Sequence, residues 1–405
     1  MLSYEFPPLG GGGSKVVDGL SAALAERGHH IDLVTTRFGD LQAFQSDGQI
    51  SIWRISSWRS KLDRSNAFEL ATYALGAFWR TLALVRSQKY DVCHAHFIFP
   101  DGLIAWIVRL LTGQRFMITA HGSDVPGYNP DRFKIMHRIL RPIWRRVVCA
   151  ADCIVCPSES LELLLRSQHD TGVTAVIPNG FEPTRFAGDF AKSPIILCVT
   201  RLFGRKGVQH LIAAAQDIDP TFELHIVGDG PYREDLQQLA GDSKTTIRFH
   251  GWIDNDAPEL EKLFGTASIF VLASEAENFP VSLLEAMSAG LAIVTIEGTG
   301  SADVVGEAGI LVPPGDVQAL RAALVRLIDD EALRSRLGTL ARHRLADSFS
   351  WSRVAQLYLD LYHKYPAWPA GGTLPRTAAP TLPQEPLEQG PQRSARTAKS
   401  DVRLS

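Results

Sequence analysis

Short apolar runs alternate with longer amphipathic stretches from the start of the chain to about residue 365. In the first half we expect strands at Ile31–Thr35, Ile52–Ile55, Val92–His94, Phe116–Ala120, Ile154–Cys156 and Ala175–Ile177. In the second half we expect strands at Ile195–Thr200, Glu223–Val227, Ile247–His250, Ile269–Ala273, Ala292–Thr295 and Ile310–Val312. Helical periodicity lies between or after most of these runs, as in Val16–Arg27, Val208–Gln216 and Val317–Ile328.

This alternation determines the expected fold class. Apolar strands that alternate with helices are typical of parallel sheets covered by helices on both faces. Two such series predict an α/β protein with two doubly wound, Rossmann-like domains. Ligands of such folds bind at the carboxyl ends of the strands, so we expect the site in a cleft between the two domains.

The charge balance changes sign near residue 185. Residues 1–185 carry 20 basic and 17 acidic residues, a balance of +3, whereas residues 186–365 carry 16 and 24, a balance of −8. Residues 366–405 carry 5 and 3, and they hold seven of the 23 prolines. We therefore expect one domain over 1–185, a second over 186–350 and a disordered tail over 366–405, either dispensable or an interaction arm.

The overall composition excludes several classes of protein. With 45% hydrophobic and 21% charged residues and a net charge of −3, the chain of 405 residues is neither intrinsically disordered nor a basic nucleic-acid coat. No apolar run approaches the ~20 residues of a membrane span. The first residues, MLSYEFPPLGGGG, lack the basic and apolar regions of a signal peptide. Five cysteines fit a reducing cytoplasm better than a disulfide framework.

Three of those cysteines, Cys149, Cys153 and Cys156, invite a zinc interpretation. They lack a fourth ligand nearby, and the spacing places Cys153 and Cys156 on opposite faces of a strand. We therefore expect no metal site, and we interpret the other two cysteines, Cys93 and Cys198, as core residues.

A glycine-rich segment, Pro7–Lys15, precedes the first amphipathic helix. Glycines let a backbone approach an anion, and a helix N-terminus favours negative charge. The P-loop and dinucleotide patterns both fail here, because Lys15 follows Ser14 and stands where the third glycine of the dinucleotide fingerprint would lie. The alternatives are an anion-binding loop and a flexible turn.

Two cations, Arg201 and Lys206, follow an expected strand and precede an expected helix. Cations at a helix entrance suit a diphosphate, whose oxygens need neutralising at several points. A solvated basic turn is the alternative.

Two glutamates, Glu277 and Glu285, flank an expected helix start at Pro280. If Pro280 opens the helix, Glu285 lies in its second turn and Glu277 just before it. Carboxylates accept hydrogen bonds from sugar hydroxyls, and backbone N–H groups at a helix start hold anions. An ordinary helix with proline in its first turn is the alternative.

Other polar segments follow expected strands. His121-Gly122-Ser123-Asp124 indicates a polar cluster at a strand tip, although a lone histidine is more often structural. Asn179-Gly180 is a turn signal, and Gly228-Asp229-Gly230-Pro231 is a tight turn before it is an anion cradle.

A cationic amphipathic stretch, Asp131–Val148, interleaves six basic residues with apolar ones. This pattern suits the surface of an anionic membrane, and equally a solvated helix packed by its apolar side. Pro142 argues against a single continuous helix.

Taken together, these segments resemble the GT-B fold, and specifically the family 4 type of retaining glycosyltransferases (glycosyl transferases group 1), over residues 1–365. The order and spacing of the glycine segment, the His121 and Asn179 turns, the Arg201–Gly207 loop and the Gly228 turn match that family. The Glu277-x7-Glu285 motif, followed by Ala286-Met287 and Gly290, is the most specific part.

The resemblance implies roles for the matched positions. Gly11 and Gly12 approach the donor diphosphate, Arg201 and Lys206 neutralise it, and Glu285 binds the nucleotide ribose. Glu277 contacts hydroxyls of the donor sugar, assisted by backbone amides of Asn278, Phe279, Pro280 and Val281. His121 lies beside the donor sugar and the acceptor, with Asp124 as a neighbour. The helix over 351–365 returns to the first domain.

Two departures from the family stand out. The first strand, before Pro7, is short, which suggests a true start upstream of Met1. Asn278 and Pro280 stand where many relatives have glycine.

The implied activity is metal-independent retaining transfer of a hexosyl group from a UDP- or GDP-linked sugar to an acceptor hydroxyl, with no cofactor. The family context implies a glycan or lipid-linked acceptor in cell-envelope or exopolysaccharide assembly, at the inner face of the cell membrane, and no nucleic-acid partner. The rivals are a nucleotide-sugar epimerase of the same fold and an inactive glycan- or membrane-binding homologue. A dinucleotide oxidoreductase is poorer, because the fingerprint fails.

Overall fold

The computed structural model describes residues 1–62, 65–128, 134–169, 172–188, 190–216, 218–241 and 243–364, with the backbone alone described over 134–138. All of these residues belong to one unit, Met1–Ala370, so the domain boundary at residue 185 stays a prediction. The predicted tail, 366–405, lies outside the described residues.

The amino-terminal half is built on parallel strands. The strands are β1 (Ile31–Arg37), β2 (Phe44–Asp47), β3 (Ile50–Ser56), β4 (Cys93–His96), β5 (Phe116–Thr119), β6 (Ile154–Cys156) and β7 (Thr174–Val176). The helices are α1 (Gly12–Ala25), α2 (Ala67–Ser87), the short turn η1 (Ile98–Gly102), α3 (Leu103–Thr112), α4 (Lys134–Ala150) and α5 (Glu159–Gln168). The strands pair in the orders β1-β3-β2 and β4-β5-β6-β7, and only β2 runs antiparallel to its neighbour.

The first residues join these two sets of strands. Leu2 forms parallel bridges to Val34 of β1 and to Ala95 of β4. The Leu2 N–H donates to the His94 carbonyl at 2.8 Å, and the Ser3 N–H donates to the Val34 carbonyl at 3.1 Å. The glycine-rich segment therefore leaves the sheet between β1 and β4, where the strand order reverses. α/β folds bind their ligands at such a switch point.

The carboxy-terminal half has a six-stranded parallel sheet in the order β10-β9-β8-β11-β12-β13. Its strands are β8 (Ile195–Val199), β9 (Glu223–Val227), β10 (Ile247–Gly251), β11 (Ile269–Leu272), β12 (Ala292–Ile296) and β13 (Gly309–Val312). Its helices and short turns are η2 (Gly204–Lys206), α6 (Val208–Ala215), α7 (Arg233–Ala240), α8 (Pro258–Thr266), α9 (Val281–Ser288), α10 (Gly300–Val305), η3 (Gly306–Ala308), α11 (Val317–Asp329), α12 (Glu331–Arg344) and η4 (Leu345–Phe349). The strand order reverses between β8 and β11, so the loops after these two strands meet at the switch point.

Both halves have helices on two faces of the sheet, and the strand residues alternate between the two layers. Ile196 and Cys198 pack with helices on one face of the second sheet, whereas Leu197 packs on the other. In the first half, Cys156 and Cys153 belong to opposite layers, as their spacing predicted, and none of the five cysteines forms a disulfide. The predicted doubly wound α/β fold class is confirmed.

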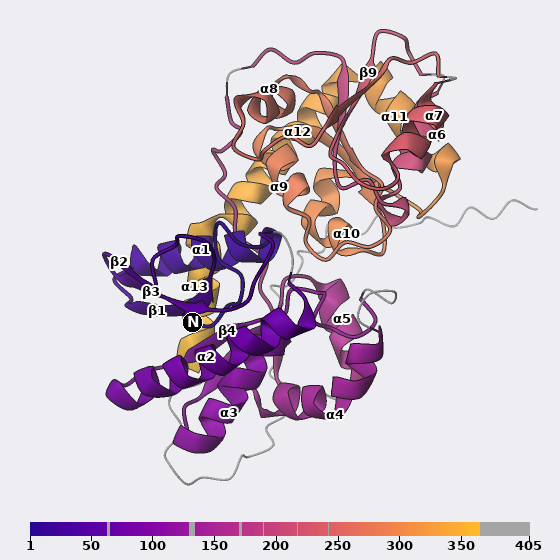
Figure 1. The fold of residues 1–405 in the computed structure, drawn as a ribbon. Coiled ribbons are helices and arrows are strands. Elements are labelled where there is room, and N and C mark those ends of the chain that lie inside the picture. The colour runs from indigo at the N-terminus through magenta and orange to yellow at the C-terminus, as the bar shows by residue number, and fades with distance from the viewer. Residues whose placement is uncertain are drawn as a thin grey trace, which may run out of the picture. The chain divides into compact units, whose positions relative to one another are not determined.

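The last described helix, α13 (Trp351–Lys364), packs on the first half of the chain (Figure 1). Val354, Tyr358 and Leu359 share a core layer with Leu20 of α1 and Met117 of β5. Glycines make this packing possible, because a Cβ on Gly19 or Gly180 would lie 2.1 Å from the Trp351 ring.

Three sequence expectations need correction. The first helix begins at Gly12 rather than Val16, because packing outweighs the low helix propensity of glycine. Strand β2 was not predicted, because its four residues are all exposed at a sheet edge and carry no burial pattern. The described part of the cationic stretch, from Lys134 on, belongs to one helix, α4, which continues through Pro142.

Candidate active site

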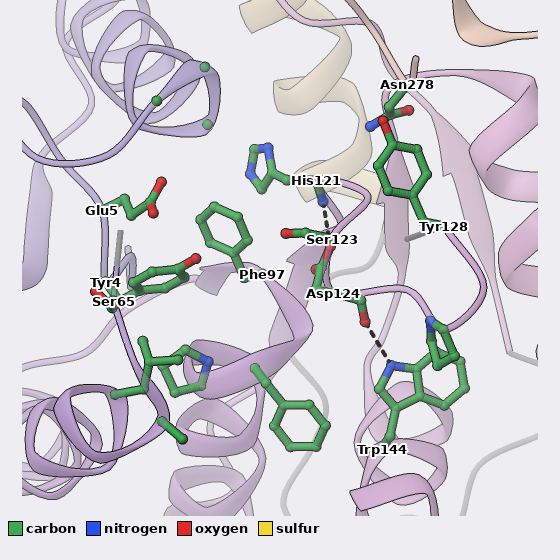
Figure 2. A pocket seen from close by; sticks show the side chains of 18 of the residues that line it. Tyr4, Glu5, Ser65, Phe97, His121, Ser123, Asp124, Tyr128, Trp144 and Asn278 are labelled. Atoms are coloured by element: carbon green, nitrogen blue, oxygen red, sulfur yellow. Dashed lines mark hydrogen bonds between the residues drawn. The ribbon is translucent and has the colours of Figure 1, made fainter. Parts of the chain in front are cut away.

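A cavity of about 1260 Å³ lies where loops from both halves meet (Figure 2). Of the predicted site residues, it is lined by Gly11, Gly12, His121, Arg201, Lys206, Glu277, Asn278, Phe279 and Val281. Pro280 and Glu285 do not line it. The structure thus brings together four segments that lie far apart in the sequence.

The loop with Arg201 and Lys206 follows β8 and rests on glycines. A Cβ on Gly228 would lie 1.9 Å from the Thr200 carbonyl oxygen, and one on Gly230 would lie 2.3 Å from that of Leu202. The Leu202 N–H donates to the Asp229 carbonyl at 2.9 Å. The segment Gly228–Pro231 is therefore a tight turn that supports the cationic loop.

Lys206 and Glu277 form an ion pair inside the cavity. The Nζ to Oε1 distance is 2.5 Å, and the two side chains are 14% and 12% exposed. Gly207 adopts a φ of 69°, and a Cβ there would lie 2.0 Å from the Ala273 carbonyl oxygen. The backbones of the loops after β8 and β11 are therefore in close contact. Within the described chain, the exposed Arg201 guanidinium has no hydrogen-bond or ion-pair partner. Three cations of this loop therefore line the cavity, Arg201, Arg205 and Lys206, of which Lys206 is paired with Glu277 and Arg201 is available to a ligand.

Asn278 connects the two halves. The Ser158 hydroxyl, which also caps α5, donates to Asn278 Oδ1 at 2.8 Å. Tyr128 lies beside Asn278 in Figure 2, and burial raises the pKa of its phenol while the Asn278 backbone N–H lowers it. A Cβ on Gly300 would lie 1.6 Å from the Asn278 carbonyl oxygen, so the backbone of Asn278 packs directly against the first residue of α10.

His121 follows β5 and is held by Asp124. The His121 N–H donates to Asp124 Oδ1 at 3.0 Å, and the Ile98 N–H donates to Oδ2 at 2.8 Å. The Trp144 indole donates to the Asp124 carbonyl at 3.1 Å (Figure 2). Burial lowers the pKa of His121 to about 4, so its ring is neutral at pH 7. Asp124 thus ties the loops after β4 and β5 together and orients His121.

The glycine segment lies opposite His121. Gly10 has a φ of 92°, which favours glycine, and α1 begins at Gly12. A Cβ on Gly13 would lie 2.8 Å from the Phe97 ring and 3.6 Å from His121 Nδ1. Gly13 therefore keeps open the space that His121 faces.

Glu285 lies in the second turn of α9, as predicted, and its side chain is buried outside the cavity lining. Burial raises the pKa of this carboxyl, and the charges of Arg185 and Lys15 lower it. In the part of the chain that the structure describes, its carboxylate has no hydrogen-bond partner. A buried carboxylate near two cations is suited to accept hydrogen bonds from a bound polyol.

Several lining residues carried no sequence signal. They are mostly aromatic or aliphatic: Tyr4, Phe97, Phe99, Leu103, Ile139, Leu140 and Trp144. Apolar residues are common in every core, so only their position at strand ends and helix starts could have suggested this role. Among the described residues, no group of three or more His, Cys, Asp or Glu side chains is arranged to hold a metal ion.

Comparison with known proteins identifies the family. Residues 10–185 match the family described as glycosyltransferase family 4, and residues 193–330 match glycosyl transferases group 1. The chain belongs to these glycosyltransferases. The resemblance inferred from the motifs is thereby confirmed.

Relatives of this glycosyltransferase cover most of its length. It is 28% identical over 398 residues to a glycogen synthase of Mycobacterium tuberculosis, covering 89% of this chain and 93% of the relative. It is 24% identical over 378 residues to N-acetyl-alpha-D-glucosaminyl L-malate synthase of Bacillus anthracis, covering 88% and 95%.

Solved structures show the same GT-B fold. Sucrose-phosphate synthase of Thermosynechococcus elongatus aligns with a TM-score of 0.72 at 25% identity, covering 87% of this glycosyltransferase and 93% of that chain. HepE of Anabaena, solved in complex with UDP-glucose, aligns with a TM-score of 0.68 at 17% identity, covering 90% and 98%.

Proposed function

We propose that the protein transfers a hexosyl group from a nucleoside diphosphate sugar to an acceptor hydroxyl, with retention of configuration and without a metal ion. The observation that carries the proposal is the single cavity that joins Arg201, the Lys206–Glu277 pair, His121 and the start of α1. The UDP-glucose in HepE, a protein of the same fold, supports a nucleotide-sugar donor. UDP and GDP remain the candidate carriers.

The proposed step breaks the bond between the anomeric carbon and the diphosphate oxygen. Its electron pair passes to the diphosphate, the acceptor oxygen bonds to the same face of the sugar, and the acceptor proton goes to the departing oxygen. Arg201 and Lys206 stabilise the charge that develops on the diphosphate. Asp124 already accepts two backbone hydrogen bonds and Glu277 pairs with Lys206, which favours this route over attack by either of these two carboxylates.

One end of the cavity is apolar, which supports an acceptor with an apolar part. Leu70 and Ala71 of α2, Leu103 of α3, and Leu140 and Trp144 of α4 line it. Sugars alone make little use of such a wall, whereas a lipid-linked acceptor buries apolar surface there.

Helix α4 provides a surface for the membrane that would hold such an acceptor. Arg141, Arg145 and Arg146 are exposed, and Ile139 and Ile143 beside them are 69% and 36% exposed. Exposed apolar side chains among arginines suit an anionic membrane surface. No helix in the described ranges is long and apolar enough to span a bilayer.

Thermal unfolding with UDP, GDP, ADP and NAD, each with magnesium and with EDTA, tests the donor site. Ligand at 100 times its Kd stabilises by ~2.7 kcal/mol, so one nucleoside diphosphate should raise the Tm equally in both conditions. A shift that requires magnesium would contradict the metal-free proposal. The stabilised protein is then incubated with the corresponding sugar donor and a crude lipid extract. Epimerisation of the donor, or binding without transfer, would replace the proposed reaction.

A further inference from the structure

A row of three histidines runs from the core of the first half into the cavity. His94 and His96 lie on β4, and His121 follows β5. The ring centroids of His94 and His96 lie 4.3 Å apart with the two rings tilted by 33°, and the rings of His96 and His121 stack with centroids 5.5 Å apart. His94 and His96 are fully buried, and the activity proposed above uses neither of them.

The inner end of the row is fixed by hydroxyl groups. His94 Nδ1 lies 2.7 Å from the Tyr362 hydroxyl on α13, and His94 Nε2 lies 2.8 Å from the Thr119 hydroxyl. The Thr119 hydroxyl is also 3.0 Å from that of Tyr358. Because His94 has a partner on each nitrogen, its ring cannot turn freely, and it presents a fixed face to His96.

His96 has one partnered nitrogen and one unpartnered nitrogen. Its Nδ1 lies 3.3 Å from His121 Nε2, whereas its buried Nε2 has no hydrogen-bond partner among the described residues. One of the two rings must donate in the Nδ1 to Nε2 contact, which leaves two arrangements. If His121 donates, neutral His96 carries its proton on Nε2 and buries an N–H group without an acceptor. If His96 donates from Nδ1, only an acceptor lone pair is left without a partner.

The second arrangement is the less costly one. An N–H group buried without an acceptor keeps its desolvation penalty, and buried donors without a partner are rarer in folded proteins than acceptors with an unmatched lone pair. When His96 donates, His121 Nε2 accepts, so neutral His121 carries its proton on Nδ1. That atom faces the space that Gly13 keeps open beside the cavity.

We propose that His96 is a positioning residue that fixes the tautomer of His121, so that His121 presents an Nδ1–H donor to an oxygen of the bound substrate. Burial lowers the pKa of both rings, which agrees with neutral histidines in the resting site. The proposal rests on the proposed function only for the identity of the substrate oxygen. The tautomer itself is a property of the protein without ligand.

The tautomer can be measured directly. In the full-length protein labelled with ¹⁵N-histidine, ring nitrogen shifts and couplings at pH 7 distinguish a protonated nitrogen from a bare one. The signals of His121 are assigned by their loss in His121→Gln. We expect His121 and His96 both to carry the proton on Nδ1. A His121 that carries its proton on Nε2 overturns the proposal, whether or not the protein transfers sugar.

Two variants of His96 test the effect on His121. In His96→Asn the side-chain amide can donate from nearly the position of Nδ1, whereas His96→Leu offers no donor. We expect His96→Asn to keep the Nδ1–H form of His121 and most of kcat/KM. We expect His96→Leu to shift His121 toward the Nε2–H form and to lower kcat/KM roughly 2- to 10-fold, the effect of one uncharged hydrogen bond. Equal activity loss in both variants, with His121 unchanged in its spectrum, would indicate a purely structural role for His96.

Discussion

At the scale of single residues, the site combines paired and unpaired charge. Glu277 holds Lys206 in the cavity, so the ammonium group is already placed before a diphosphate arrives. Arg201 is exposed and has no partner in the described chain, so its guanidinium can turn toward the ligand. In the proposed reaction both cations stabilise a charge that grows as the leaving group departs, so removing either should affect the chemical step more than ground-state binding.

Substitution of either cation should therefore lower kcat. Arg201→Ala and Lys206→Ala each remove one charged donor that would stabilise the leaving group. We expect each change to raise the activation barrier by ~2.7–4 kcal/mol, which lowers kcat about 100-fold or more. Initial rates with saturating donor measure the effect. Lys262→Ala removes an exposed lysine from α8 and serves as control. Near wild-type kcat in both site variants would refute the assigned role.

The polar part of the site could be predicted from the sequence, and the apolar part could not. His121 and Arg201 follow strands β5 and β8 closely, and Glu277 precedes the helix start at Pro280, and polar residues in such connecting loops often carry function. For Asn278 the resemblance implied only a backbone contact, and the bond of its side chain with Ser158 depends on how two distant loops meet. The same holds for His96, whose proposed role depends on its contacts with the rings of His94 and His121.

At the scale of elements, periodicity located most strands and helices but not their exceptions. Pro280 correctly marked the start of α9, because its fixed φ suits a helix entrance. Pro142 did not break α4, since the surrounding packing keeps that helix continuous. The turn η1, which joins β4 to α3, has no periodicity and is held by Asp101, which accepts from the Tyr73 hydroxyl at 2.8 Å and from the Tyr4 N–H at 3.1 Å.

Asp101 should make stability depend on pH. Burial raises the pKa of this carboxyl to about 8 in the folded protein, well above its ordinary value of 3.8. The folded state then binds a proton that the unfolded state releases, so this contribution to stability falls as pH rises from about 4 to about 8 and is level above that. Urea unfolding of wild type and Asp101→Asn at pH 5, 6.5 and 8 measures it.

We expect the neutral amide in Asp101→Asn to flatten this part of the stability profile. Asp47→Asn, in the exposed strand β2, is the matched control and should keep the wild-type slope. A slope in Asp101→Asn as steep as that of wild type would assign the pH dependence to other groups.

At the scale of the whole molecule, α13 connects the end of the described chain to its beginning. The Trp351 ring lies against Gly19 of α1 and Gly180 after β7. Because α1 begins at the glycine segment that lines the cavity, a change in the packing of Trp351 would act on the helix whose first turn faces the cavity. The turn signal at Asn179-Gly180 is thus also a packing requirement.

A side chain on Gly180 should disturb the packing of Trp351. In Gly180→Ala the Cβ would lie 2.1 Å from the Trp351 ring, so the helix must shift, and overpacking of this kind costs ~1–3 kcal/mol. Gly172→Ala, where nothing lies within 4 Å of the added Cβ, is the control. Chemical unfolding measures both variants, and equal midpoints would show that α13 adapts without cost.

Helix α13 is translated last of the described elements, although it completes a core layer of the first half of the chain. The layer of Leu20, Met117 and Val155 in the first half is completed only by Tyr358 and Leu359. At ~5–20 residues per second, the roughly 170 residues between β7 and α13 take on the order of 10–30 s to translate. During that interval the first half of the nascent chain exposes an apolar face, so a ribosome that stalls before α13 produces a chain suited to chaperone binding rather than to catalysis.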